Sequence, residues 1–398
     1  MKRSFSPTGA ALLAASVLLA ACNNDTGSTP LPGGEDEHDH DHGAESAGRL
    51  VFTHADGSNS RVYVHDLESR STLADFALVH PATAVHSSPE HRYAVIVQRD
   101  NDQVEFLDGG VYRHDDHVDE GDPAMLPFTL SGVRPTHYRH HGEQAALFFD
   151  GDSASAALSQ FHLFSDESLE SGGTLAHQTL DTAHHGIAEP LDGVVLASHA
   201  AASGDAPDGI SVFELHGDHF DDAKIAVAER LATVVGHPDV AEFAAFSYPG
   251  GNLYALDPEA GTATQVDWRD GAVDGDGDPV SALARGFDGH GEHLLVLDSN
   301  GDLHVLESSD WSHRGSIAVL DSVPASGPAP ALAVSAAGDQ AFVSDPAAPA
   351  IHIIDLEALS LEAVPLAFPP TGLAWTGVGE AHDHDGHDDH DEDHDHDH

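Results

Sequence analysis

The sequence of 398 residues contains a single cysteine, Cys22, and few basic residues. One thiol cannot form an internal disulfide or a thiolate metal cage. The 15 Lys and Arg stand against 68 Asp and Glu, which gives a formal net charge of −53. Such a surface repels nucleic acid and anionic lipid and attracts cations. We therefore exclude nucleic-acid binding, and we expect any transition-metal site to consist of His, Asp and Glu.

Those ligand types suit Zn²⁺ and, less selectively, Cu²⁺ or Ni²⁺. Adaptation to a salty environment is an alternative cause of the general acidity. It does not account for the 33 histidines, because histidine is nearly neutral at pH 7 and adds little solubility. The sequence also lacks a Gly-x-Ser-x-Gly elbow, a P-loop and a dinucleotide fingerprint. Nothing in it supports nucleophilic catalysis, and we predict that the protein is not an enzyme.

The N-terminus has the features of an export signal. The positive residues Lys2 and Arg3 precede an apolar run at 10–21, which is shorter than the ~20 residues of a membrane-spanning helix. The run ends in Leu-Ala-Ala-Cys, which resembles the bacterial lipobox, and this predicts removal of residues 1–21 and lipidation of Cys22. An ordinary signal peptide with an incidental cysteine is the alternative. Because Asn23 follows the cysteine, resemblance to proteobacterial lipoproteins favours a periplasmic protein anchored to the outer membrane.

Composition divides the mature chain into three parts. Residues 22–48 are rich in Gly, Pro, Asp, Glu and Ser, which predicts a lipidated, flexible, His-containing tether. Residues 380–398 consist of Asp, His, Glu and Gly with a single Ala, which predicts a disordered tail that buries nothing. Residues 49–379 lie between them and are long enough for one large domain.

This middle part shows a repeated pattern of short strands. Apolar or alternating runs are separated by Asp-Gly, Gly-Gly and Gly-Asp turns, which is typical of an all-β protein. Strand starts near positions 84, 137, 186, 242, 285, 331 and 372 recur at intervals of roughly 45 residues, as in propeller blades. Pairing the last of these strands with the first strands of the domain would close the ring. We predict a single seven-bladed β-propeller; six or eight blades and a two-sheet sandwich are the alternatives.

Two low-complexity tracts are the clearest chemical signal. In an extended chain, residues i and i+2 point to the same side, so His-x-His brings two imidazoles together. Interleaved aspartates add oxygen ligands and raise imidazole basicity. The tracts predict loose metal binding in many interchangeable arrangements, with a solvated acidic tail as the alternative. Their candidate ligands are His38, His40, His42, His382, His384, His394, His396 and His398.

A second group of histidines lies within the predicted propeller. His137 begins an inner strand, and His184 and His185 precede the next one. In a propeller such strand starts surround the mouth of the central channel, and a loop carrying His114 and His117 could cover them. Three or four converging imidazoles would make a tetrahedral zinc site. Each of these residues taken alone is better explained as a surface or hydrogen-bonded histidine.

These residues also resemble a known family. The motifs His-Asp-Asp-His at 114–117, Gly-Val-Arg-Pro-Thr-His at 132–137, Phe-Phe-Asp-Gly at 148–151 and His-His-Gly at 184–186 are similar to those of periplasmic zinc metallochaperones. The resemblance implies a β-propeller with a folded zinc site and a flexible His/Asp-rich segment. It also implies a partner, the solute-binding protein of a zinc ABC transporter. The family's cysteine-flanked segment has no counterpart at 236–242, so no ligand is carried over from there.

We therefore predict a periplasmic zinc-binding protein that captures zinc and delivers it to that partner. The only contact with the membrane would be the lipid anchor. Two other functions remain open at this stage. One is a propeller hydrolase that uses a channel metal with an open coordination position and a carboxylate base. The other is a protein-interaction propeller whose histidine tracts only buffer metal.

Overall fold

The computed structural model describes residues 47–56, 59–114, 117–191, 193–200, 207, 209–226, 234–236, 243–246, 252–257 and 262–379. All of them belong to one compact unit, Gly43–His398. The predicted signal peptide, nearly all of the tether and the whole tail lie outside these residues. Within the described part of the chain, no helix is both long and apolar enough to cross a membrane.

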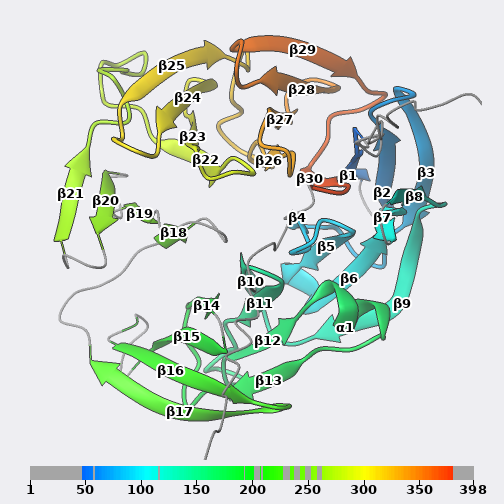
Figure 1. Cartoon of the computed structure of the whole chain (residues 1–398), viewed down its shortest axis with the longest axis vertical. Coiled ribbons are helices and arrows are strands. Elements are labelled where there is room, and N and C mark those ends of the chain that lie inside the picture. Colours follow the sequence, from blue (N-terminus) through cyan, green and yellow to red (C-terminus); the bar gives the residue numbers. More distant parts are fainter. Residues whose placement is uncertain are drawn as a thin grey trace, which may run out of the picture. The chain divides into compact units, whose positions relative to one another are not determined.

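The described part of the chain consists almost entirely of β-strands and the turns between them (Figure 1). Helical structure in the described ranges is limited to α1 (Asp166–Glu170) and a 3₁₀ turn at Arg99–Asn101. The strands are β1 (Arg49–Asp56), β2 (Asn59–Asp66), β3 (Ser71–Ala77), β4 (Ala84–Ser87), β5 (Tyr93–Gln98), β6 (Gln103–Asp108), β7 (Val111–His114), β8 (His117–Glu120), β9 (Ala124–Ser131), β10 (Pro135–His141), β11 (Gln144–Phe149), β12 (Gln160–Phe164), β13 (Ala176–Thr179), β14 (Ala188–Leu191), β15 (Val194–His199), β16 (Gly209–His216), β17 (His219–Ala226), β18 (Val234–Gly236), β19 (Phe243–Phe246), β20 (Leu253–Asp257), β21 (Thr262–Val266), β22 (Ala282–Phe287), β23 (His293–Asp298), β24 (Asp302–Glu307), β25 (His313–Ala318), β26 (Leu332–Val334), β27 (Gln340–Asp345), β28 (Ala350–Asp355), β29 (Ser360–Pro365) and β30 (Gly372–Thr376).

The described strands form seven four-stranded antiparallel sheets and one separate hairpin, β7–β8. In each sheet the strands follow chain order, except where the hairpin is inserted before β9 and where the two chain ends meet. First strands of neighbouring sheets contact one another, as β30 does with β4, β10 with β14, and β22 with β26. Figure 1 shows these first strands nearest the centre of the unit. The all-β, propeller-like fold is confirmed, and a two-sheet sandwich is excluded; the blade count stays a prediction.

Most predicted inner strands lie where the repeat placed them, with one exception. β4, β10, β14, β22, β26 and β30 begin within three residues of the expected positions. The prediction of an inner strand near 242 is wrong. A strand does lie there, β19 at Phe243–Phe246, but it is the second strand of its sheet, and β18 is the first. β18 is only three residues long, Val-Val-Gly, which is too short to produce an alternating pattern.

The two ends of the domain share one sheet, with the order β3-β2-β1-β30. β30 pairs antiparallel with β1, so that Trp375 lies opposite Leu50 and Thr376 opposite Arg49. The predicted pairing of the chain ends is therefore confirmed. β1 is thereby paired on both sides, by β2 and β30, whereas β30 ends this sheet and contacts β4 of the next one.

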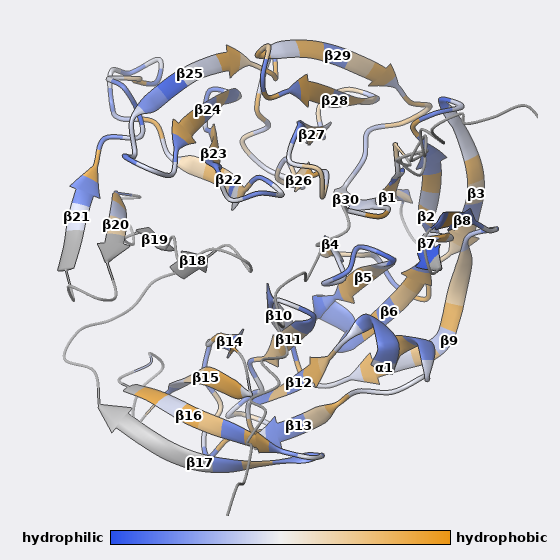
Figure 2. Ribbon diagram, viewed as in Figure 1, coloured by the Kyte–Doolittle hydropathy of each residue, from blue (hydrophilic) through white to orange (hydrophobic). Residues whose placement is uncertain are grey.

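The core consists of the faces between neighbouring sheets. Middle strands such as β5 and β23 are apolar along nearly their whole length and are buried throughout (Figure 2). They are buried on both faces, which explains their continuous apolar runs rather than strict alternation. Between the sheets of β11 and β15, for example, Phe148 and Phe161 pack with Val195 and Phe213. At about 25 cal/mol per Å² of apolar surface buried, these layers dominate the stability of the unit.

Replacing Trp375 with alanine should destabilise the junction of the two chain ends. The side chain is 2% exposed and packs in a cluster with Leu50, Phe52 and Phe342. We expect a loss of about 3–5 kcal/mol in the free energy of unfolding, measured by urea denaturation, because the change leaves a cavity. Trp375→Phe should cost clearly less. A loss below about 1 kcal/mol for the alanine variant would show that this junction does not hold the ring closed.

Candidate metal centre

His137 lies near the start of β10, the first strand of its sheet. The pairing of β10 with β11 is irregular between Pro135 and Tyr138, so His137 falls inside a β-bulge. Bulges re-aim a side chain out of the regular alternation and are frequent beside functional sites. The preceding residue is fixed by a hydrogen bond from the Thr136 hydroxyl to the Arg134 carbonyl, at 2.8 Å.

His185 comes from the loop that leads into β14, and Asp150 holds this loop in place. Asp150 directly follows β11, and its carbonyl accepts hydrogen bonds from the His184 amide at 3.1 Å and from the Ser159 hydroxyl at 2.7 Å. Its carboxylate Oδ2 lies 3.0 Å from His185 Nδ1. The next residue, Gly186, leaves no room for a side chain, because a Cβ there would lie 2.7 Å from the Phe148 ring.

The two histidines point at one another through their ring nitrogens. His137 Nε2 lies 3.2 Å from His185 Nε2, and the rings are tilted by 55°. Two imidazoles bound to one tetrahedral zinc, each at ~2.0–2.1 Å, would have their nitrogens about 3.3–3.4 Å apart. The same separation also suits an N–H···N hydrogen bond. The distance alone therefore does not distinguish a metal site from a hydrogen bond. The groups that orient the two rings make that distinction.

The carboxylate of Asp150 lies behind His185 and accepts a hydrogen bond from its Nδ1–H. This bond leaves the lone pair of Nε2 directed toward His137. Such carboxylate–histidine–metal arrangements are usual in zinc proteins, where they fix the tautomer and raise the basicity of the ligand. Asp150 is itself 5% exposed and held by Arg99, whose guanidinium donates to Oδ2 at 2.7 Å. The pair is thus preorganised by a buried carboxylate and an arginine.

The other oxygen of that carboxylate, Asp150 Oδ1, is buried and accepts no hydrogen bond among the described residues. A buried carboxylate oxygen without a partner is unfavourable unless a cation or a water compensates it. This orphan atom therefore fits a metal or an ordered water beside the pair. Two imidazole donors, one of them oriented by a carboxylate, also match the chemistry expected for zinc.

The pKa values of the two rings are shifted in opposite directions. Burial, together with Arg139, lowers the pKa of His137 to about 4, so this ring is neutral and able to ligate at pH 7. The hydrogen bond to Asp150 raises the pKa of His185 above its usual value, against the opposing effect of burial. His185 is therefore the ring whose proton competes with a metal.

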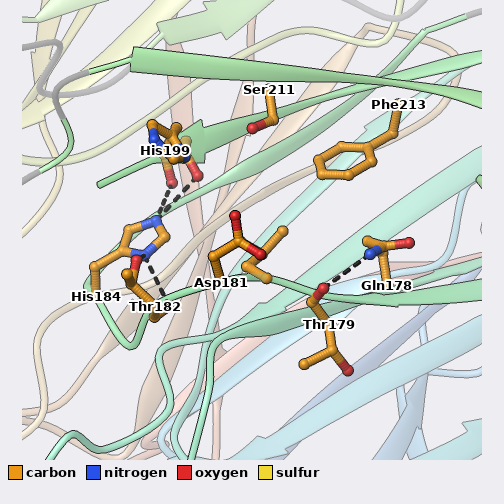
Figure 3. Close-up of a pocket in the computed structure, with 10 residues that line it drawn as sticks. Gln178, Thr179, Asp181, Thr182, His184, His199, Ser211 and Phe213 are labelled. Carbon is orange, nitrogen blue, oxygen red and sulfur yellow. Dashed lines mark hydrogen bonds between the residues drawn. The ribbon is translucent and has the colours of Figure 1, made fainter. Parts of the chain in front are cut away.

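The predicted ligand His184 faces away from this pair. It lines a small pocket of about 30 Å³ together with Thr182, Ser198 and His199 (Figure 3). Its Nε2 lies 3.0 Å from the Ser198 carbonyl oxygen, and its Nδ1 lies 3.3 Å from that of Thr182. Both nitrogens are therefore engaged by the protein, and burial lowers the pKa of this ring. Adjacent residues in the loop point in opposite directions, which the sequence motif did not show.

The predicted ligands His114 and His117 lie at the turn of the hairpin β7–β8, where they are paired residues. The hairpin is anchored through Gly121, whose carbonyl accepts a hydrogen bond from Arg49 at 2.8 Å. His117 is exposed, and its Nε2 lies 3.6 Å from an Asp119 oxygen. Figure 1 shows the hairpin beside β2, β3 and β9, which are outer or intermediate strands, rather than at the centre. That His114 and His117 contribute to a zinc site at His137 stays a prediction.

The remaining predicted sites lie outside the described residues. Among the side chains that the structure describes, no three of His, Asp and Glu form a complete metal-ligand group. The folded part therefore offers a two-histidine pair with a carboxylate behind it. Sequence reasoning assigned no role to Asp150 or Arg99, although Asp150 ends the apolar run of β11. The predicted site residues without a described position are Cys22, His38, His40, His42, His382, His384, His394, His396 and His398.

Replacing Asp150 with asparagine should weaken metal binding while leaving both histidines in place. We expect zinc affinity at the pair to fall by roughly 10–100-fold, the usual cost of losing such a carboxylate. Asp152→Asn is a matched control, because Asp152 lies in the following loop and is 3.7 Å from Arg134. Competition with a zinc chelator measures both variants. Equal affinities for the two would refute the orienting role of Asp150.

Comparison with known proteins shows similarity in sequence and in fold. No protein-family model matches the chain. Over 169 residues the chain is 26% identical to the zinc chaperone AztD of Citrobacter koseri, a match that covers 41% of this chain and 39% of that relative. The predicted resemblance to the zinc metallochaperones is confirmed. In sequence, the matched part is about two fifths of the relative's length.

The fold is shared over a longer stretch. Apo AztD from Citrobacter koseri superposes with a TM-score of 0.66 at 17% identity, covering 85% of this chain and all of that one. A second crystal structure of AztD gives 0.64 at 19% identity, with 84% and 99% covered. A protein of unknown function from Desulfotomaculum acetoxidans gives 0.55 at 10% identity. At these identities the superpositions establish a common fold, and they leave the ligands to be argued from this chain's own residues.

Proposed function

We propose that this protein captures zinc and passes it to the solute-binding protein of a zinc ABC transporter. The observation that carries the proposal is the contact between His137 and His185, backed by Asp150, on a fold shared with a zinc chaperone. Zinc is the cargo here rather than a resident cofactor. The same donors also bind Cu²⁺ and Ni²⁺, but the similarity to a zinc chaperone favours zinc.

A site with two protein imidazoles is suited to transfer. Tetrahedral zinc held by His137 and His185 has further coordination positions for incoming ligands. Imidazole and carboxylate ligands exchange one at a time, so a receiving protein can attack the metal before the donor releases it. A closed four-ligand site would hinder that exchange. The open pair is thus an argument for a carrier rather than a structural zinc site.

In this proposal the histidine tracts collect zinc and supply the open positions. The tracts at 37–42 and 382–398 contain repeated His-x-His units, which bind zinc loosely. Tethering to the folded unit gives their imidazoles an effective concentration in the mM range near the pair, as for short flexible linkers. We propose that this takes place in the periplasm, with Cys22 lipidated and the outer membrane favoured over the inner membrane as the site of anchoring, as the leader sequence predicts.

A hydrolase mechanism is less well supported by the geometry. It would require a carboxylate free to act as a base on a metal-bound water. The carboxylate at this site, Asp150, is bonded to Nδ1 of His185 and therefore stands behind the ring, away from the Nε2 that would hold the metal. The interaction-only alternative does not explain why a buried carboxylate orients one of two facing imidazoles.

Zinc transfer between purified proteins tests the proposal. Full-length protein loaded with zinc is mixed with the metal-free solute-binding protein of a zinc ABC transporter, and the rate of metal appearance on the acceptor is measured. We expect that rate to rise with acceptor concentration and to exceed the rate of zinc release to a small chelator. Direct ligand exchange predicts this order, whereas release followed by diffusion does not.

His185→Gln and His177→Gln make a matched pair of variants for this assay. His185 belongs to the proposed site, and His177 is an exposed histidine on β13 of the same region. Only the first should slow transfer. If transfer by the wild type is as slow as passive release, the carrier function is wrong. If both variants transfer as fast as the wild type, the pair is not the donor site.

A further inference from the structure

A second pair of histidines faces nitrogen to nitrogen on β24 and β25, in a different sheet from His137. His304 Nδ1 lies 3.3 Å from His313 Nε2, and the rings are tilted by 66°. The corresponding values for His137 and His185 are 3.2 Å and 55°. Two imidazoles bound to one tetrahedral zinc by bonds of ~2.0–2.1 Å have their nitrogens about 3.3–3.4 Å apart, and both observed nitrogen–nitrogen distances are close to this value.

A buried carboxylate orients this second pair as well. Asp298 Oδ2 accepts a hydrogen bond from His304 Nε2 at 3.1 Å, which leaves the Nδ1 lone pair directed toward His313. The other oxygen, Asp298 Oδ1, accepts from the backbone amides of Asn300, Gly301 and Asp302 at 2.8–3.0 Å. His304 is thus fixed in one tautomer, ready to act as a ligand.

The outer member of the pair is accessible and has its own carboxylate. His313 has a side chain 18% exposed, whereas that of His304 is 4% exposed. Asp270 Oδ2 lies 3.8 Å from His313 Nδ1, and the Asp270 side chain is 74% exposed. Trp268, fully buried, meets the His304 ring edge-on at 5.4 Å and closes the inner side. A cation can therefore reach the two nitrogens from solvent, and Asp270 can turn toward it.

Other histidine contacts in the described part lack this arrangement. His162 and His177 stack with an interplanar angle of 19°, so their rings meet face to face. His293 has a buried carboxylate behind it, since Asp288 Oδ2 lies 2.6 Å from Nδ1. Its Nε2, however, lies 2.6 Å from Arg314, and a guanidinium there excludes a metal cation. These histidines are consistent with structural roles.

We propose that His304 Nδ1 and His313 Nε2 form a second site for a divalent transition metal of the zinc class, with Asp270 as the nearest exposed carboxylate. In the metal-free state His313 Nε2–H donates a hydrogen bond to His304 Nδ1. When the metal binds, that proton moves to His313 Nδ1, on the side of Asp270, so that both facing nitrogens offer lone pairs and both rings stay neutral. The site lies outside the His137–His185 pair and goes beyond the transfer function, because it gives the folded unit a second zinc that needs neither the pair nor the tracts.

Thermal unfolding of the full-length protein with and without Zn²⁺ tests this site. A metal bound only to the folded state raises the melting temperature, whereas tracts that bind zinc in folded and unfolded chains alike add little. Two folded sites of similar affinity each contribute about half of the rise. We therefore expect His313→Gln to remove about half of the zinc-induced rise, and His137→Gln combined with His313→Gln to remove nearly all of it.

Two further variants make the outcome decisive. Asp270→Asn changes an exposed residue, so the protein should fold, and it should reduce the rise in the same direction as His313→Gln. His177→Gln is the control and should leave the rise unchanged. A full zinc-induced rise in both His313→Gln and Asp270→Asn overturns the second site. That result would leave the transfer function untouched, since the transfer assay depends on His185, and a slow transfer by His185→Gln would leave this site standing.

Discussion

Replacing both His137 and His185 with glutamine is expected to abolish zinc binding at the centre of the folded unit. Structural zinc sites with four ligands are worth about 10–16 kcal/mol, or roughly 2.5–4 kcal/mol for each ligand. Removing two imidazoles should therefore lower the affinity there by roughly 1,000-fold or more. The measurement is the zinc retained per chain after equilibration with a competing chelator at pH 7.5, where the double variant should lose one equivalent.

The control for this experiment is a double variant of two other histidines in the same sheet. His141 ends β10, and His177 lies on β13. Changing both to glutamine removes as many imidazoles from the chain but leaves the facing pair intact. Retention of zinc by the His137/His185 variant, equal to that of the control, would mean that the metal is held elsewhere.

Zinc affinity at the same pair should depend on a single proton. The pKa of His137 is lowered to about 4 by burial, so this ring stays neutral and contributes no pH dependence between pH 5 and 8. The pKa of His185 is raised by Asp150, so below that pKa the metal must displace one proton. Affinity should then be constant above the His185 pKa and fall about tenfold per pH unit below it.

Chelator competition between pH 5 and 9 gives this profile directly. If the logarithm of the zinc affinity instead falls by two per pH unit, or about 100-fold, both rings titrate together and His137 is not held neutral by burial. In Asp150→Asn the hydrogen bond that raises the His185 pKa is lost. The fall in affinity should therefore begin at a lower pH in that variant, even though its maximum affinity is weaker.

Much of the fold was predictable from sequence because each repeat contains apolar runs with the length of a β-strand. Middle strands such as β5 and β23 are apolar throughout, and turns between them carry Gly and Asp, so the period was visible. The joining of β1 and β30 followed from counting unpaired strands. The fifth sheet was misplaced because β18 is a three-residue strand, and so short a run gives no periodic signal.

The candidate site was only partly predictable. Placement at strand starts identified His137 and the 184–185 pair, but sequence could not say which of two adjacent histidines faces His137. That choice depends on Asp150, which binds the amide of one and the ring of the other. The pair His304 and His313 was missed altogether. It depends on a turn in which the Asp298 carboxylate binds three backbone amides and a ring, a contact that no spacing rule reveals.

Because β1 and β30 are neighbours, the chain enters and leaves the folded unit at one place. Gly48 and Gly377 lie close enough that a side chain at Gly377 would meet the Cα of Gly48. The two segments that carry the histidine tracts therefore join the described part of the chain at neighbouring points. Deleting either tract should reduce the supply of imidazole near this junction without removing it.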